Sequence, residues 1–172
     1  MHTKLIIRDE ISFDQEPIFK LTLAAFETLE ISNHTEQLII DELRNAGALT
    51  VSLVAEYDSV IVGHIAFSPV TVSDGTTGWY GLGPVSVLPE HQRKGIGKQL
   101  IEAGLNRLKA IHAKGCCLVG HPGYYGRFGF TNPSTLTLEG VPAEVFFALP
   151  FVGPIPKGKV AFHEAFLKDY HT

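Results

Sequence analysis

The stretch of sequence that decides the fold is VSVLPEHQRKGIGK, residues 85–98. Its first three residues end a β-strand pattern, and Pro89 stops that strand. Gly95 and Gly97 then open an amphipathic helix, because apolar residues recur with helical spacing over 100–111. Glycines also leave room for a ligand to approach the backbone closely. The segment therefore predicts a strand, a turn and a helix whose first turn contacts a ligand.

The ligand that this helix start favours is an anion. The first backbone N–H groups of a helix have no partner inside the helix, and the positive end of the helix dipole lies behind them. Arg93, Lys94 and Lys98 add positive charge to the same turn. A pyrophosphate-like group is the natural occupant of such a site.

Two other glycine-loop motifs do not fit this segment. A Walker-type phosphate loop needs four residues between its glycines and then Lys-Ser or Lys-Thr, whereas Gln99 follows Lys98. A dinucleotide-binding fingerprint needs a third glycine at position 100, which is Leu100. A nucleotide-binding module is therefore disfavoured.

Two motifs resemble those of the GNAT superfamily of N-acetyltransferases. The run QRKGIG at 92–97 is similar to the family's Gln/Arg-x-x-Gly-x-Gly/Ala signature, in which the loop amides hold the pyrophosphate of coenzyme A. The run YYGRFGF at 124–130 is similar to the family's Tyr-x-x-x-Gly-Phe ending. The run at 119–130 further resembles a bacterial subgroup known mainly as predicted acetyltransferases. The order of elements extends the resemblance over nearly the whole chain.

The fold that the resemblance implies is mixed α/β (α+β). It is a GNAT-type acyl-CoA N-acyltransferase fold, with a single, mostly antiparallel central sheet flanked by helices, and it forms one domain over residues 1–172. The local patterns agree, since they contain no repeat and no linker. A strand is expected at 3–8, then a helix capped by Asp14 that runs to Leu29. A second helix starts at the capping-box pattern of Asn33 and Glu36, turns Leu38, Ile39 and Leu43 inward, and ends at Gly47.

The second half of the chain is expected to be richer in strands. Strands at 49–57 and 60–73 are joined by a hairpin turn at Asp58-Ser59, and a third strand at 78–88 completes an antiparallel meander. A helix at 97–114, a strand at 116–120, a compact and partly helical stretch at 122–130 and at least two more strands follow.

The activity that the resemblance implies is transfer of the acetyl group of acetyl-CoA, as co-substrate, directly to a primary amine of a small molecule or a protein. No covalent enzyme intermediate is expected. Two alternatives stay open: transfer of a longer acyl chain, and a non-catalytic domain that binds or senses coenzyme A. The sequence does not identify the acceptor amine.

The residues that the resemblance assigns to the coenzyme fall into two sets. The backbone of the strand that contains Val85, Ser86 and Val87 would hold the pantetheine arm as an added strand would. The phosphates would be held by Arg93, Lys94, Gly95, Ile96, Gly97 and Lys98, chiefly through N–H groups. A merely structural turn is the alternative for the glycines.

Two residues are expected to transfer protons, a general acid and a general base. By the resemblance, Tyr125 would be the general acid that protonates the departing thiolate, with aromatic packing beside Phe128 and Phe130 as the alternative reading. Tyr124 is the less favoured of the two tyrosines. For the general base, His121 is the first candidate because an unperturbed histidine titrates near pH 6.5. His64, Glu27 and solvent are the other candidates.

One departure from the family pattern affects these assignments. Many GNAT enzymes carry an Asn just after the fifth strand that contacts the pantetheine, whereas GHPG stands here at 120–123. The acceptor is expected near the loop over 26–35, which is mildly acidic. The apolar run at 145–156 would be an acceptor-site wall, a dimer surface or a buried strand.

Composition excludes several classes of protein. The chain has 172 residues, is 45% hydrophobic and carries a formal net charge of −4, which argues against a general nucleic-acid binder. No apolar run is long enough to span a bilayer. Cys116 and Cys117 are adjacent and read as core residues, which favours a reducing, cytoplasmic location. The eight histidines are too scattered for a metal site. A homodimer is the commonest soluble assembly, but the sequence leaves the oligomeric state open.

Overall fold

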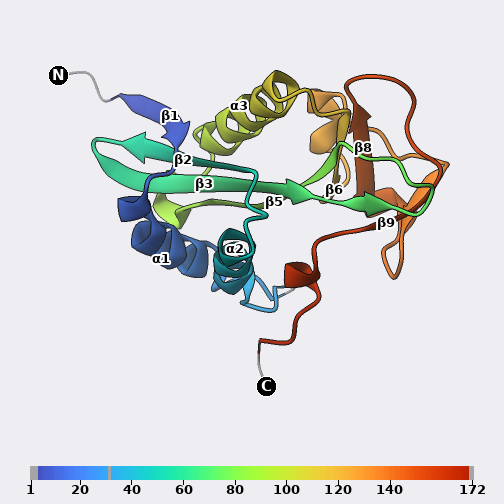
Figure 1. Cartoon of the computed structure of the whole chain (residues 1–172). Coiled ribbons are helices and arrows are strands. Elements are labelled where there is room, and N and C mark those ends of the chain that lie inside the picture. Colours follow the sequence, from blue (N-terminus) through green and yellow to red (C-terminus); the bar gives the residue numbers. More distant parts are fainter. Residues whose placement is uncertain (1–3, 31, 171–172) are drawn as a thin grey trace.

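A mixed sheet of six strands, in the order β1-β2-β3-β5-β6-β8, is the centre of the fold (Figure 1). The computed structural model describes residues 4–30 and 32–170. All neighbouring strands are antiparallel except β5 and β6, so the prediction of a mostly antiparallel sheet is confirmed. The strands are Leu5–Asp9 (β1), Val51–Tyr57 (β2), Val60–Pro69 (β3), Trp79–Val87 (β5), Gly115–Val119 (β6) and Phe146–Pro150 (β8).

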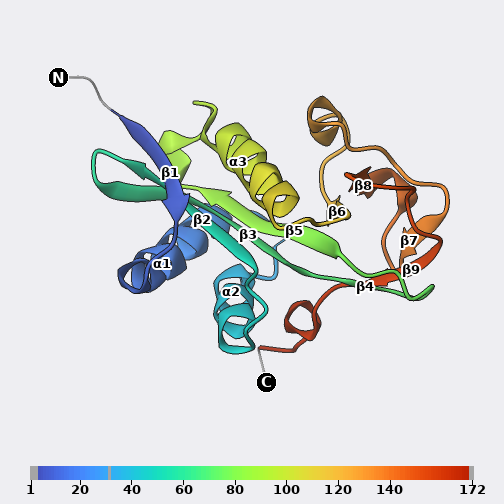
Figure 2. The same ribbon diagram turned by 45° about the horizontal axis from the view of Figure 1, so that its top comes forward.

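Helices cover both faces of this sheet (Figures 1 and 2). On one face, α3 (Ile96–Ala110) buries Leu100 and Leu108 against Phe67 of β3. The contact is close, because a Cβ at Gly104 would lie 2.2 Å from the Phe67 ring. On the other face lie α1 (Gln15–Phe26) and α2 (Glu36–Asn45). The expected mixed α/β architecture is therefore present.

The hairpin between β2 and β3 forms where the sequence predicts it. Asp58 and Ser59 have φ of 50° and 66°, the left-handed conformation that both central residues of a type I′ turn require. Such a turn matches the twist of the strands that it joins. The register of β2 against β3 is thus set locally.

A second, three-stranded sheet departs from the expectation of a single sheet. It has the order β4-β9-β7, with β4 at Thr71–Val72, β9 at Gly158–Ala161 and β7 at Leu136–Leu138 (Figure 2). The strand expected at 60–73 breaks after Pro69, and its last part leaves β5 to pair with β9. Val72, Leu136 and Val160 are buried between the small sheet and the large one. The three strands are too short for a periodic pattern to reveal them.

The ends of the first two helices differ from the prediction. The Asp14 carboxylate accepts a hydrogen bond from the Ile11 N–H at 2.7 Å and lies against Arg8, so it closes the 3₁₀ turn η1 (Ser12–Asp14) rather than capping α1. The helix stops at Phe26 instead of Leu29.

The second helix starts later than its capping-box pattern indicates. It begins at Glu36, whose carboxylate accepts from the Ser32 hydroxyl at 2.7 Å. Ile39 and Leu43 are buried as expected, whereas Leu38 is half-exposed and Ile40 takes its place in the core. The predicted end is confirmed, since Gly47 has φ of +70°.

The remaining elements are close to their predicted ranges. The last α-helix ends at Ala110, four residues before the predicted 114, and the compact stretch holds the 3₁₀ helix η3 (Tyr125–Phe128). Thr3, the predicted start of the first strand, lies outside the described residues. Further 3₁₀ turns are η2 (Pro89–His91), η4 (Ala143–Val145) and η5 (Glu164–Phe166). Within residues 4–30 and 32–170, no helix has the length and apolar character needed to cross a membrane.

Candidate active site

The central feature of the site is an opening in the sheet where β5 and β6 part. Residues 79–81 pair in parallel with residues 115–117, and the pairing ends there. Beyond that point β5 continues alongside β3 to Val87, and β6 continues alongside β8 to Val119. No strand in the described part of the chain pairs with this side of β5. Its peptide groups therefore form an open edge to which an extended, amide-bearing molecule can add.

The loop that follows this open edge leads into the start of α3. Gly95 is the N-terminal cap of the helix and adopts the left-handed conformation, with φ of +81°. A Cβ at Gly95 would meet no atom within 4 Å, so the space in front of the helix is empty of protein. The first amides of α3, from Ile96 to Lys98, point into this space because a helix leaves them unpaired. The geometry is that of an anion site.

The charges around this loop also favour the binding of an anion. Arg93, Lys94 and Lys98 are all exposed, and the first turn of α3 contains no acidic residue. Arg93 has φ of +64°, which is uncommon outside glycine and shows that the loop is tightly turned. The Gln92 side chain donates a hydrogen bond to the Val87 carbonyl at 3.0 Å. That contact, which the sequence did not reveal, ties the loop to the end of β5.

Tyr125 lies on the opposite wall of the opening, just beyond β6. Its ring packs over Gly120, where a Cβ would lie 2.2 Å from Tyr125 Cε2, and against Phe130 and Phe147 at centroid distances of 6.1 and 6.0 Å. Burial, followed by the neighbouring Tyr124, raises the pKa of the Tyr125 phenol above its usual value. The phenol is therefore protonated at neutral pH and available as a donor. The sequence singled out Gly120 only as part of the GHPG run that departs from the family pattern, and it did not predict the contact with the Tyr125 ring.

His121 occupies an exposed position before η3. Its Nδ1 lies 2.6 Å from the Pro122 carbonyl oxygen. A carbonyl oxygen only accepts, so Nδ1 carries the proton in the neutral ring, and Nε2 is left as the proton-accepting atom. The structure thus places a histidine of defined tautomer at the end of β6, four residues before Tyr125.

The other candidate base on a strand, His64, is not accessible. Its side chain is 0% exposed on β3, and burial, aided by the charge of Arg44, lowers its pKa to about 3. The interpretation of His64 as a base in direct contact with the acceptor is therefore wrong. Glu27 is exposed at the end of α1.

The two cysteines are core residues. Cys116 and Cys117 are free thiols with 0% exposure in β6. Burial raises the pKa of Cys117 to about 12, and the pKa of Cys116 lies well above its usual value for the same reason. A thiol is nucleophilic only as thiolate, so neither is a nucleophile at neutral pH.

The apolar run at 145–156 contributes β8, which pairs with β6 and buries Phe146, Phe147 and Ala148. Its first part is therefore a buried strand, one of the three readings that the sequence allowed. The acidic loop between α1 and α2 keeps Glu27 and Glu30 exposed.

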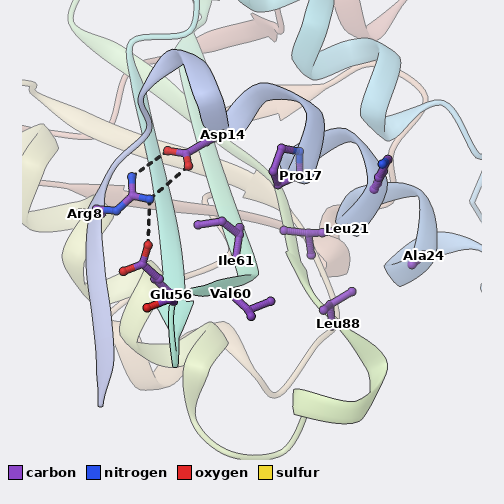
Figure 3. Close-up of a pocket in the computed structure, with 11 residues that line it drawn as sticks. Arg8, Asp14, Pro17, Leu21, Ala24, Glu56, Val60, Ile61 and Leu88 are labelled. Carbon is purple, nitrogen blue, oxygen red and sulfur yellow. Dashed lines mark hydrogen bonds and ion pairs between the residues drawn. The ribbon is translucent and has the colours of Figure 1, made fainter. Parts of the chain in front are cut away.

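A separate cavity of about 620 Å³ lies between α1 and the β2–β3 hairpin (Figure 3). Arg8 donates to Asp14 at 2.7 and 3.1 Å and to Glu56 at 3.1 Å, so its charge is matched inside the protein. Leu21 and Leu88 form part of an apolar wall. The three charged groups nearest the β1–β2 side of this cavity, Arg8, Asp14 and Glu56, are therefore already paired with one another. Among the residues described, no three or more His, Cys, Asp or Glu side chains form a group suited to a metal ion.

Comparison with known proteins identifies the class of enzyme to which these features belong. The family model of the acetyltransferase (GNAT) family matches residues 16–130. The chain belongs to the GNAT family, and the enzyme class predicted from the sequence, an acetyl-CoA-dependent N-acetyltransferase, is confirmed.

Similar proteins are found among bacterial members of the family. The chain is 34% identical over 127 residues to YhbS of Escherichia coli K12, described as an uncharacterized N-acetyltransferase, and the match covers 73% of each chain. A crystal structure of a GNAT acetyltransferase from Brucella melitensis in complex with acetyl-CoA is 47% identical, with a TM-score of 0.86, over 96% of this chain and 99% of that one. A structure of E. coli YhbS in complex with CoA is 28% identical, with a TM-score of 0.87, over 98% and 94%. The predicted GNAT-type fold is thereby confirmed.

Proposed function

We propose that this enzyme transfers the acetyl group of acetyl-CoA directly to a primary amine of a small molecule or a protein. The observation that carries the proposal is the opening between β5 and β6, which has an anion-binding helix start beyond one strand and a protonated phenol beyond the other. Two relatives of nearly the same length were solved with acetyl-CoA or CoA bound. That supports the same ligand for this chain.

The coenzyme arm is held along the open edge of β5. The peptide groups of Val85, Ser86 and Val87 offer hydrogen bonds to the amides of pantetheine. The amides and side chains from Arg93 to Lys98, including Gly95, Ile96, Gly97 and Lys94, face the pyrophosphate. In this arrangement the thioester lies between β5 and the Tyr125 ring.

The transfer has one carbon–nitrogen bond to form and one carbon–sulfur bond to break. His121 Nε2 takes a proton from the substrate ammonium, which frees the nitrogen lone pair to attack the thioester carbonyl carbon. The nitrogen of the adduct loses its second proton, and when the carbon–sulfur bond breaks, the Tyr125 hydroxyl gives its proton to the departing thiolate and regains one from solvent. Positioned proton transfer of this kind contributes about 10²–10⁴ in rate.

The first test is thermal unfolding with acetyl-CoA, coenzyme A, ATP and NAD added separately. A ligand at about 100 times its dissociation constant stabilises the fold by about 2.7 kcal/mol. For a chain of this size the melting temperature then rises by roughly 5–10 °C. A shift with acetyl-CoA and coenzyme A alone is expected. A shift with ATP or NAD instead would contradict the proposal.

The second test separates an enzyme from a binding domain. The enzyme releases free thiol from acetyl-CoA when a primary amine is added, whereas a sensor binds the coenzyme and releases none. Repeating the assay with propionyl- and butyryl-CoA compares acetyl transfer with transfer of a longer acyl chain. A faster rate with butyryl-CoA would contradict the acetyl specificity.

A further inference from the structure

A row of polar side chains crosses the buried face of the sheet beneath α1 and α2. Val85 and Val87 pack against the core under α3, as does Ile65, so the alternate residues Ser86 and His64 face the other side. Ser52 of β2 is on that side too, and all three are more than nine-tenths buried. Together with Glu10 they form what we call the polar row.

The outer end of the row is an ionised carboxylate. Arg44 of α2 donates to Glu10 Oε2 and Oε1 through Nε and Nη2, both at 3.0 Å. A carboxylate paired in this way has no proton to give and only accepts. The Ser52 hydroxyl, which contacts Glu10 Oε1, therefore points its one proton outward to Glu10.

The direction of the next hydrogen bond follows from this. Ser52 Oγ lies 2.7 Å from His64 Nε2, and since the Ser52 proton is already used, Nε2–H is the donor. The other ring nitrogen, Nδ1, then carries only a lone pair in the neutral ring. It is buried and has no hydrogen-bond partner in the part of the chain that the structure describes.

The inner end of the row is Ser86, on the strand that borders the opening. His64 and Ser86 are cross-strand partners of β3 and β5, which places their Cβ atoms roughly 5 Å apart. The Ser86 hydroxyl is also buried without a partner among the described residues. Neither atom has a partner in the described structure, so the row is completed only when the Ser86 side chain changes its rotamer and donates to His64 Nδ1. With that hydrogen bond made, every proton of the row points toward Glu10 and every lone pair points toward β5.

The chemistry of amide formation calls for such a route. A substrate ammonium carries three protons and the amide product keeps one, so two must leave the nitrogen. His121 accounts for the first, before attack. We propose that the polar row removes the second proton, from the nitrogen of the tetrahedral adduct, by passing it from Ser86 through His64 and Ser52 to Glu10. This inference rests on the proposed function.

The protons move together along the row, so that Ser86, His64 and Ser52 each gain one proton as they lose another and stay neutral. Because the Ser86 hydroxyl is buried, the nitrogen gives its proton to Ser86 Oγ through a water that enters with the substrate, as the Ser86 proton moves to His64 Nδ1. The Nε2 proton moves to Ser52, and the Ser52 proton moves to Glu10 Oε1. Glu10, 16% exposed at its side chain, then loses the proton to water. Reorientation of the two hydroxyls and the imidazole restores the starting state.

The charges around His64 favour a ring that passes a proton without holding one. Burial is the main cause that lowers the pKa of the His64 imidazole, and the charge of Arg44 adds to it, while Asp14 acts in the opposite direction. Glu10 Oε1 lies 3.9 Å from Nε2. The imidazole is consequently neutral over the working range of pH.

The test compares variants of the row with a matched buried serine. Ser52→Ala and Glu10→Gln interrupt the row, and Ser52→Thr keeps its hydroxyl. Ser68→Ala is the control, because the Ser68 hydroxyl is also 0% exposed and unpartnered in the described structure but lies outside the row. Thiol release is measured with acetyl-CoA and the probe amines benzylamine and ethanolamine, in water and in mixtures with heavy water.

We expect kcat to fall at least about tenfold in Ser52→Ala and Glu10→Gln, with the KM for acetyl-CoA unchanged. The dependence of kcat on heavy-water fraction should be curved in the parent enzyme, as for several protons in motion, and linear in Ser52→Ala. Ser52→Thr should recover most of the rate, and Ser68→Ala should match the parent. Nitrogen-15 NMR of His64 should show Nε2 protonated.

Several outcomes overturn the proposal. Equal effects of Ser52→Ala and Ser68→Ala would show that the row only supports the fold. A proton on His64 Nδ1 in the NMR spectrum would reverse the row and exclude outward transfer. Binding of acetyl-CoA without thiol release by any amine would refute the proposed function and, with it, this inference. Absence of a thermal shift with acetyl-CoA would instead refute the proposed function, whatever the His64 tautomer.

Discussion

The position of the Tyr125 ring over Gly120 makes a sharp prediction for a single added methyl group. In Gly120→Ala the new Cβ would lie 2.2 Å from Tyr125 Cε2 and 2.8 Å from Cδ2. Ordinary contact begins near 3.4 Å, so the ring must retreat by about 1.2 Å. Gly120 does not have a positive φ, so the backbone accepts alanine. The new Cβ would also lie 3.0 Å from Leu118 Cδ1, a milder contact than that with the ring.

The expected cost falls on turnover rather than on coenzyme affinity. Misplacing a reacting group by about 1 Å costs on the order of 10²-fold in rate. We therefore expect kcat of Gly120→Ala to fall about 100-fold. Tyr125→Phe, which removes the acid itself, should lower kcat at least about tenfold. The thermal shift given by coenzyme A should be unchanged in both variants.

The matched control is Gly126→Ala in η3, where a Cβ would meet nothing within 4 Å. It adds the same methyl group to the same segment without touching the ring. Thiol release under saturating acetyl-CoA and a primary amine is the assay. If Gly120→Ala and Gly126→Ala have the same kcat, the ring position is irrelevant and Tyr125 is not the general acid. If the double variant of Gly120→Ala and Tyr125→Phe is worse by the product of the single effects, the two residues act independently.

Two further predictions concern the anion site and the acid limit of stability. Gly95 and Gly47 have φ of +81° and +70° and open space where a Cβ would lie, so Gly95→Ala and Gly47→Ala should lose similar amounts of folding stability. Only Gly95→Ala should weaken the binding of coenzyme A, which is measured by calorimetry. Equal affinities of the two variants for coenzyme A would show that the Gly95 loop is not part of the binding site. Hydrogen bonds from Arg8 hold the pKa of Asp14 below its ordinary 3.8, so the pair adds stability above that pH and loses it as pH falls through the lower folded value. Asp14→Asn should thus cost about 1–3 kcal/mol in urea unfolding at pH 7 and progressively less below about pH 3.8; a constant difference across that range would exclude the ion pair as the cause.

The features that the sequence predicts well are those decided by a few neighbouring residues. The β2–β3 hairpin depends on Asp58 and Ser59, and the start of α3 depends on Gly95 and the proline before it. In each case the turn chemistry and the flanking pattern lie within a dozen residues. Both elements therefore appear where the sequence places them.

Features decided by partners distant in the sequence were not predictable. The small sheet joins Thr71–Val72 to Gly158–Ala161, and no pattern in either segment indicates the other. The parting of β5 from β6 after Gly81 leaves no periodic signal, although it creates the site. His64 illustrates the same limit. Its alternation with Ile65 placed it on one face of β3, but only the packing of α1 and α2 shows that this face is closed to solvent.

The short ladder between β5 and β6 has a consequence for the pace of the catalytic cycle. Three residue pairs, 79–81 with 115–117, hold the two strands together on that side, so a ligand along the rest of β5 stands in for a missing length of strand. On the proposed function, the product leaves by breaking the backbone hydrogen bonds that the ligand makes along this open edge. The rate of product release therefore depends on the open edge of β5, whereas the rate of amide formation depends on the proton-transferring groups around the opening.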